Sequence, residues 1–537
     1  MVDIVGLRML FSPTYAPNLR AIDIVGSIDE TIVFNFGARF YDDEIYFLNK
    51  SWLYMFKNMK DRAEIKAYLS YDLFPLSILL VALIIAVSPW LCSHLLPHFL
   101  PYDNQRIIEL IFLIIIAGGL SLYAPYRTHA LQIWTTWPKH IQVSLLILLG
   151  LGLLSASLAA KPSWSLLEVS LYTLLFLFAL SIAGLRQQPY IDLKLTATIY
   201  LSSLAYLIIL FYTNIQHHVI LVLVNFINPR FFGQYQILTL WLISLPLLLT
   251  RSHRSIKYMG YLISALWWSL AYVEAAKGVF IALAITIFIL FILYKRNMLN
   301  WLIPHLFVAI GGFVIYVLLQ HLSPLVKHDT SLAMYQIQPT AGSISFRLEL
   351  WHTALKMIRQ HPWLGVGPMH FSHTLPNTNA AHPHNSLLLL ASEWGLPALG
   401  LMLWVAYYGI NKWIQYSRQQ LNPLTLSLSA TLCSGLLYSL ISGVFVTPLS
   451  QLLLAFIIGW MMGKAHIVQH RSLSETAHEA LIACSLAASI GIIVIAGPML
   501  PILTQQEIQW VITQHTAHSD SDTYFAPRFW IQGWIPM

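Results

Sequence analysis

The stretch KGVFIALAITIFILFILYKRN (277–297) places seventeen uncharged and almost entirely apolar residues between Lys277 and Lys295. This is close to the run of about 20 apolar residues that an α-helix needs to cross a bilayer. Similar runs recur along the 537 residues, of which 57% are hydrophobic and only 10% charged, and the mean hydropathy is +0.65. Soluble domains carry about 25% charged residues. The chain is therefore expected to be an integral membrane protein.

The expected fold is all-α, a polytopic bundle of membrane helices. Ten-residue segments of alternating polarity, which are typical of a membrane β-barrel, are not found in the sequence. We expect about thirteen spanning helices, near residues 73–96, 107–125, 141–160, 165–185, 195–213, 233–250, 258–274, 277–294, 300–320, 394–410, 424–445, 448–463 and 481–502.

The distribution of Lys and Arg predicts the orientation of this bundle. Alternate short loops hold thirteen basic residues, whereas the opposite short loops hold only four, namely Arg106, Lys161, Arg230 and Lys277. Basic loops stay in the cytoplasm. The face with four basic residues is therefore expected to be the outer, periplasmic face of the membrane. The net charge of +7 is spread through the loops, so nucleic-acid binding is not expected.

The topology divides the chain into five parts. We expect a cytoplasmic extension at 1–72, nine spanning helices at 73–320, a periplasmic catalytic loop at 321–385, four further helices at 386–502 and a periplasmic tail at 503–537. Part of the extension can also be an upstream start-site artefact, because MKDRAEIKAYLSYDLFPLSILL, from Met59, reads like a natural start. The aromatic stretch TYFAPRFWIQGWIPM (523–537) either folds onto the loop or lies at the membrane interface, where Trp and Tyr are favoured.

The long outer loop contains two recognisable segments. SFRLELWHTALKMIRQHP (345–362) has apolar residues at helical spacing and is expected to form a helix that ends before Pro362. AAHPHNSLLLLASEWGLPAL (380–399) starts a second helix at Asn385, a residue suited to an N-cap. A loop of this length without a function of its own is uncommon.

Eight histidines lie in this loop, and they allow two interpretations. A metal site could use His370, His373, His382 and His384, but their spacing does not specify the three or four ligands that zinc requires. We therefore expect no metal and no cofactor. The second interpretation makes His384 a proton acceptor, because imidazole titrates near physiological pH. A capping or interfacial histidine is the more frequent role from spacing alone.

Cations on the same face supply the other part of the hypothesis. Arg347 lies in the loop, and Arg230 and Lys277 lie at outward helix ends. Such cations usually extend to lipid headgroups. However, guanidinium groups also bind phosphate oxygens in a bidentate manner. Diphosphate binding is therefore a candidate role for these residues.

Several motifs resemble the O-antigen ligase/polymerase superfamily over roughly residues 73–465. HN (384–385) followed by nine residues and GLPA (395–398) resembles the family signature, and RLELWHTALKMIRQHPWLGVGPMHF (347–371) resembles the segment upstream of it. Weaker similarities are found in FINPRFFGQYQ (226–236), SASLAAKPSWSLLEVSLY (155–172) and PYDNQRIIEL (101–110). The last is similar to a motif of pilin- and protein-glycosylating members. Two residues depart from the family pattern, Lys277 where Arg is frequent and Ala398 where Gly is usual.

The resemblance implies a glycosyltransferase that moves a glycan from an undecaprenyl-diphosphate carrier to an acceptor hydroxyl, with inversion and without a metal. It implies that His384 activates the acceptor hydroxyl and that Arg347 and Arg230 hold the diphosphate. His384 and Arg347 are thus the catalytic candidates, and the substrate-binding candidates are Arg230, Lys277, Asn385, His382, Glu393 and Arg106. We expect Glu393 to be an orienting or structural partner rather than the base.

The expected acceptor is pilin or another protein, which makes the chain an O-linked oligosaccharyltransferase. The alternatives are lipid A-core, for a lipopolysaccharide ligase, and a growing glycan, for a polymerase. A metal-dependent lipid-carrier transferase is disfavoured because PHFLPYDNQR (97–106) contains a single acid, Asp103. A transporter or flippase is a more remote alternative, because the spans are almost free of charge and no internal repeat is evident. Membrane lipids are further expected partners.

Overall fold

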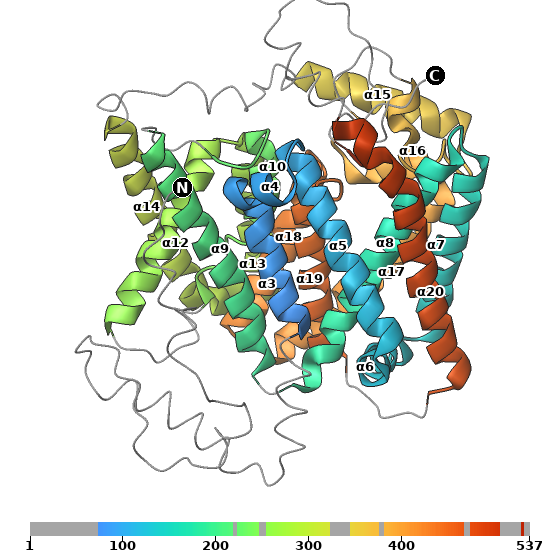
Figure 1. Ribbon diagram of the computed structural model, residues 1–537. Helices are drawn as coiled ribbons and strands as arrows, with labels where there is room; N and C mark the ends of the chain where they lie inside the picture. The colour runs from blue at the N-terminus through green and yellow to red at the C-terminus, as the bar shows by residue number, and fades with distance from the viewer. Residues whose placement is uncertain are drawn as a thin grey trace, which may run out of the picture. The chain divides into compact units, whose positions relative to one another are not determined.

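The computed structural model describes residues 74–188, 190–217, 223–245, 254–322, 344–374, 381–466, 473–504 and 528–530. The chain divides into two compact units, residues 1–69 and 70–537, and every described residue belongs to the second. The predicted extension 1–72 and most of the predicted tail lie outside the described residues. Within the described ranges the regular structure is helical, without strands (Figure 1). The predicted all-α fold is confirmed.

The helices follow one another along the chain with short connections. The first half contains α3 (Phe74–Val87), α4 (Pro89–Leu95), α5 (Pro101–Leu122), α6 (Ala124–Thr135), α7 (Lys139–Leu158), α8 (Pro162–Gly184), α9 (Ile191–Gln216) and α10 (Pro229–Ile237). The second half contains α12 (Arg254–Glu274), α13 (Lys277–Tyr294), α14 (Leu299–Leu322), α15 (Ile344–Gln360), α16 (Ser386–Trp394), α17 (Leu396–Gln419), α18 (Pro423–Ser439), α19 (Pro448–Ala465) and α20 (Glu475–Ala496). Short 3-10 helices also occur in the described ranges, namely η3 (Leu185–Gln187), η4 (Lys295–Met298), η7 (His370–Thr374) and η8 (Gly497–Met499).

Seven helical segments in the described ranges are long and apolar enough to cross a membrane, or up to eight if the bent pair α3–α4 counts as one span. One of the seven, Lys277–His321, includes both α13 and α14. The helices α12, α17 and α18 follow predicted spans without being among the seven. The protein is thus a polytopic helical membrane protein, and the number of about thirteen spans stays a prediction.

The predicted span 73–96 is broken in the structure. The axes of α3 and α4 differ by 96°. Pro89 has no amide hydrogen with which to continue α3, and Ser88 caps the new helix by accepting the Leu91 amide at 3.2 Å. The apolar run therefore forms a long and a short helix, and the prediction of one continuous span is wrong.

The predicted span 233–250 is likewise not one α-helix over its described residues. Helix α10 ends at Ile237 and is followed by hydrogen-bonded turns. Buried polar groups hold these turns to α12: the Gln236 side chain donates to the Trp267 carbonyl at 2.7 Å, and the Trp267 indole donates to Thr239 at 3.0 Å. Counting apolar residues in the sequence does not predict these hydrogen bonds between buried polar groups.

Helix α8 has a central position among the helices of this protein. It packs against α19, α20, α6, α7 and α5. Gly459 of α19 allows the closest approach, because a Cβ at this position would lie 2.4 Å from the Ala179 carbonyl oxygen of α8. Gly463 repeats the contact one turn later against Ala183. Small residues of this kind let membrane helices approach closely.

One end of the bundle collects the elements of the predicted site. Figure 1 shows α15 lying across this end, near α16, with α4 and α10 at the same end and α6 at the opposite one. Helix α15 follows the prediction for 345–362 and ends at Gln360, two residues before Pro362. The remainder of the predicted loop includes 323–343 and 375–380, which lie outside the described residues.

The contact between α8 and α19 can be tested at Gly459. Gly459→Ala is expected to lower the free energy of unfolding by about 1–3 kcal/mol, because the added methyl group forces two helix backbones apart. Thermal unfolding in detergent measures the effect. Gly409→Ala in α17 is the matched control, because no atom lies within 4 Å of its added Cβ. Equal unfolding temperatures for the two variants would contradict the close contact.

Candidate active site

The turn before α16 carries two histidines and a helix cap. The Asn385 side-chain oxygen accepts the amides of Leu387 and Leu388, each at 3.0 Å. His384 has a left-handed backbone with φ 51°, a conformation in which His, Asn and Asp are enriched among residues other than glycine. Its amide donates to Nδ1 of His382 at 3.2 Å, and the two ring centroids are 4.3 Å apart. The turn therefore holds both imidazoles in a defined geometry.

His384 lies among the cations of two other elements. Burial, then the charge of Arg347 on α15 and then that of Arg230 on α10 lower the pKa of His384 to about 4. Burial and the charge of Arg230 also lower the pKa of Arg347. Three predicted residues from separate parts of the chain thus lie within electrostatic reach of one another. The imidazole of His384 is neutral near pH 7 and can accept a proton.

Helix α12 contributes a carboxylate that the sequence analysis missed. Both carboxylate oxygens of Glu274 are buried and lack a hydrogen-bond partner in the described part of the chain. They pack against Gly233 of α10, where a Cβ would lie 2.1 Å from Oε1. The charge of Arg230 acts on this carboxylate. Arg230 therefore lies near a buried carboxyl group as well as near His384. An acidic residue at the end of an apolar helix was the available signal.

The other side of the turn is lined by hydroxyl and amide groups. The Gln234 amide is hydrogen-bonded to the hydroxyls of Ser442, at 2.7 Å, and Thr447, at 2.6 Å. The His382 ring packs against Gly443, where a Cβ would lie 2.9 Å from Cε1. Burial, followed by the charges of His384 and Arg528, lowers the pKa of His382 well below its usual value. His382 is thus a neutral, packed side chain behind His384.

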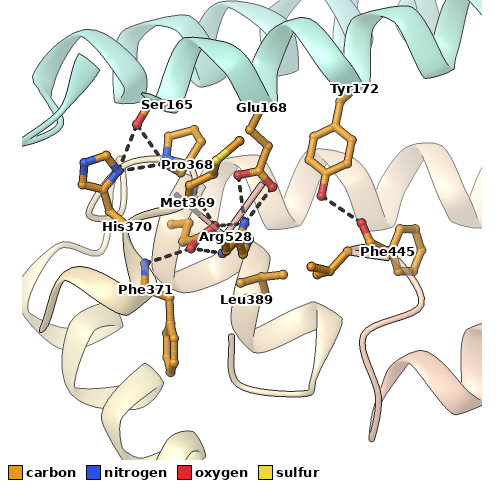
Figure 2. A network of polar contacts seen from close by, with 12 residues as sticks. Ser165, Glu168, Tyr172, Pro368, Met369, His370, Phe371, Leu389, Phe445 and Arg528 are labelled. Carbon is orange, nitrogen blue, oxygen red and sulfur yellow. Dashed lines mark hydrogen bonds and ion pairs between the residues drawn. The ribbon is translucent and has the colours of Figure 1, made fainter. Parts of the chain in front are cut away.

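Glu393 belongs to a buried ionic cluster. Figure 2 shows Arg528 beside Glu168 of α8; its Nη2 donates to both Glu168 oxygens at 2.7 and 2.8 Å and to Glu393 Oε2 at 2.6 Å. Nη1 donates to Glu393 Oε1. The Glu393 carboxylate also accepts the amides of Met369, at 3.1 Å, and Phe371, at 2.9 Å. Burial raises the pKa of Glu393, which the charge of Arg528 opposes and that of Glu168 reinforces. The expected orienting role of Glu393 fits these contacts.

His370 is engaged in internal hydrogen bonds (Figure 2). Its Nε2 accepts the Lys161 amide at 2.9 Å, and its Nδ1 lies 2.8 Å from the Pro368 carbonyl oxygen and 3.1 Å from Ser165 Oγ. Because Nε2 accepts, Nδ1 carries the proton and donates to the carbonyl. A search of the described residues finds no group of three His, Cys, Asp or Glu side chains that could hold a metal ion.

Two predicted substrate-binding residues, Lys277 and Arg106, make no hydrogen bond or ion pair with His384 in the described part of the chain. Lys277 is the exposed first residue of α13. Arg106 is buried in α5 and donates to Glu109 Oε2 at 2.6 Å, the Val446 carbonyl at 2.6 Å and the Phe529 carbonyl at 3.0 Å. These bonds occupy the guanidinium inside the protein and favour a structural role for Arg106. Its assignment to substrate binding, like that of Lys277, stays a prediction.

Comparison with known proteins supports the family resemblance. Residues 238–405 match the family model described as O-Antigen ligase. A protein of Pseudomonas aeruginosa named O-antigen ligase is 34% identical over 111 residues, which are 20% of this chain and 27% of that protein. The chain is thus similar to the O-antigen ligase/polymerase superfamily, and the resemblance found in the sequence motifs is confirmed. The similarity spans about a quarter of the length of the relative.

The family match covers some of the site and leaves other parts outside. Within 238–405 lie Lys277, Arg347, His382, His384, Asn385 and Glu393, as well as Glu274. Arg230, Arg106, Glu168 and Arg528 lie outside it. The candidate site thus combines residues of the matched segment with ionic partners from the rest of the chain.

Asn385 allows a direct test of the cap. Asn385→Ala is expected to destabilise α16 by about 1 kcal/mol, because two amides lose their acceptor, whereas Asn385→Ser retains one. Hydrogen–deuterium exchange of the α16 amides measures the difference. The exchange of α13 in the same samples is the control. Equal exchange in the alanine, serine and wild-type proteins would show that the cap does not stabilise α16.

Proposed function

We propose that this chain is a membrane glycosyltransferase that moves a glycan from undecaprenyl diphosphate to an acceptor hydroxyl. The supporting observation is the convergence of Arg347, Arg230 and a neutral His384 at one end of the bundle. Two guanidinium groups suit a diphosphate, whose oxygens they bind in a bidentate manner. A neutral imidazole within electrostatic reach of them suits a hydroxyl that must lose its proton.

The proposed reaction is a single displacement. The acceptor oxygen attacks the anomeric carbon of the glycan while the bond from that carbon to the diphosphate oxygen breaks. The electron pair leaves with the diphosphate, and Arg347 and Arg230 stabilise its developing charge. The hydroxyl proton passes to His384. Because attack is opposite to the leaving group, the anomeric configuration is inverted.

The negative charge of the donor diphosphate also raises the pKa of His384 in this proposal. In the free protein, burial and the charges of the two arginines make His384 a weak base. A bound diphosphate neutralises part of their charge, so that protonation of the imidazole becomes easier. The base is therefore strengthened when the donor is in place. This order favours transfer to the acceptor over proton uptake by the free enzyme.

The proposed acceptor is a pilin or other protein hydroxyl, on the periplasmic face of the bacterial inner membrane. The PYDNQRIIEL segment (101–110), similar to that of protein-glycosylating members, favours a protein acceptor. The similarity to a protein named O-antigen ligase favours lipid A-core as the second candidate. The distribution of Lys and Arg supports the orientation.

A gene deletion followed by complementation tests the function and the acceptor. Pilin mass and lipopolysaccharide banding are measured together. Loss of pilin glycan with normal lipopolysaccharide is expected, and the reverse result would assign the chain as a ligase. If both are unchanged, both assignments are wrong. His384→Asn, which suits the left-handed backbone, is expected not to restore the phenotype. His352→Asn, at an exposed histidine of α15, is the matched control.

The pH dependence of the purified enzyme tests the role of His384. kcat/KM for the donor reports the free enzyme and kcat reports the complex. Both are expected to fall as the pH decreases through the pKa of His384, near 4 in the free enzyme. The midpoint for kcat is expected at higher pH, because the diphosphate offsets the arginine charges.

Arg347→Gln extends this test. Removal of one positive charge raises the pKa of His384, so the kcat/KM midpoint is expected to move to higher pH. Arg359→Gln, at an exposed arginine of the same helix, is expected to leave the midpoint unchanged. A midpoint that is the same in Arg347→Gln and wild type would show that His384 is not the titrating base.

A further inference from the structure

Residues 528–530 are fully embedded in the protein. Arg528, Phe529 and Trp530 are 4%, 2% and 1% exposed. Their contacts reach α8 and α16 through Arg528, α5 through Phe529, and Met499 of η8 through the Trp530 indole at 3.4 Å. Three residues thus connect four elements that are distant in sequence. A segment that only anchored the chain at the membrane interface would not need these buried contacts.

A first chain of contacts leads from Arg528 to His384 through α16. Arg528 binds the Glu393 carboxylate, and the Glu393 carbonyl accepts the Gly367 amide and the Ser155 hydroxyl, both at 3.0 Å. Glu393 lies at one end of the nine-residue α16, and His384 directly precedes the cap at the other. A short α-helix transmits a displacement of one end to the other with little loss. The position of Glu393 therefore determines that of the turn.

A second chain of contacts leads to the same turn from the opposite side. The Phe529 carbonyl accepts Arg106 Nε at 3.0 Å, and the Arg106 guanidinium lies 4.8 Å from the Phe529 ring centroid. Arg106 donates to the Val446 carbonyl at 2.6 Å, and the Val446 amide donates to the Gly443 carbonyl at 2.8 Å. Gly443 is the residue against which the His382 ring packs.

We infer that Arg528 is a positioning residue for His384, acting through Glu393 and α16, and that Phe529 completes the support through Arg106 and the turn behind His382. The inference rests on the proposed function insofar as it takes His384 to be the reacting base. Arg347 and Arg230 come from α15 and α10, which have no contact with Arg528 among the described hydrogen bonds and ion pairs. Arg528 thus binds α16 and not the helices of the two arginines, so its loss is expected to affect the position of His384 more than donor binding.

The charge of the cluster explains why arginine is needed here. One guanidinium serves two buried carboxylates, and its planar fork reaches both at once, which a lysine ammonium cannot do in the same way. Removal of Arg528 alone would leave two buried carboxylates without a counter-ion, a change that destabilises proteins strongly. The test therefore includes a variant that removes one carboxylate as well.

Steady-state kinetics of the full chain in nanodiscs test the inference. The variants are Arg528→Lys, Arg528→Gln and the double variant Arg528→Gln/Glu168→Gln, with a synthetic undecaprenyl-diphosphate glycan as donor. The folded double variant is expected to lose at least about tenfold in kcat, since misplacement of a reacting group by about 1 Å can cost 100-fold. Its KM for the donor is expected to stay within about threefold of wild type. Arg528→Lys is expected to be intermediate.

A structural measurement tests the inference without relying on glycan transfer. Hydrogen–deuterium exchange of α16 amides is expected to be faster in the double variant, whereas α13 exchanges as in wild type. Arg359→Gln is the control for loss of an arginine and is expected to change neither kcat nor exchange. If the wild-type protein transfers no glycan, the proposed function fails, and the exchange of α16 still decides whether Arg528 positions the turn.

Three results would overturn the inference. The first is a folded double variant with wild-type kcat. The second is unchanged exchange of α16, whatever the activity. The third is loss of folded protein in both Arg528→Lys and the double variant, which would assign Arg528 to folding rather than to positioning. A drop in kcat that is matched by an equal loss of donor affinity also contradicts the separation of the two roles.

Discussion

A single guanidinium between two carboxylates, that of Arg528, joins the parts of this protein that surround the candidate site. Buried ions are expensive to remove from water, and their attraction compensates only when the hydrogen bonds are complete. Here Glu168 is fixed on the central helix α8, and Glu393 adds two backbone amides to its ionic bonds. The end of the short helix α16 and the Gly-containing turn after α15 are both bound to this cluster.

The site therefore has two supports of different character. On one side, α10, α12 and α15 place Arg230 within electrostatic reach of both Glu274 and Arg347, although the two arginines repel each other. On the other side, uncharged contacts and hydrogen bonds fix the histidines against α16 and the loop before α19. The two sides meet at the turn before α16, where the Trp351 indole of α15 donates to the Pro383 carbonyl at 3.0 Å.

The sequence predicts the local features of this arrangement and fails on the distant ones. Helix α15 with its end before Pro362 and the Asn385 cap follow from patterns within a few residues. The break at Pro89 was overlooked because the apolar run continues past it. Arg528 has partners 135 and 360 residues away, and no periodicity or spacing can signal such a pair. Arg106 was likewise assigned from its predicted face, whereas two carbonyls distant in sequence hold it.

The left-handed backbone of His384 limits the residues that evolution can place there. Most side chains resist this conformation, and those that accept it best are Gly, Asn, Asp and His itself. Of these, only His has an imidazole. A descendant of this protein that had lost its chemistry but kept its fold would therefore be expected to carry Gly, Asn or Asp at this position. Such a replacement would identify, from the sequence alone, a homologue that has lost its activity.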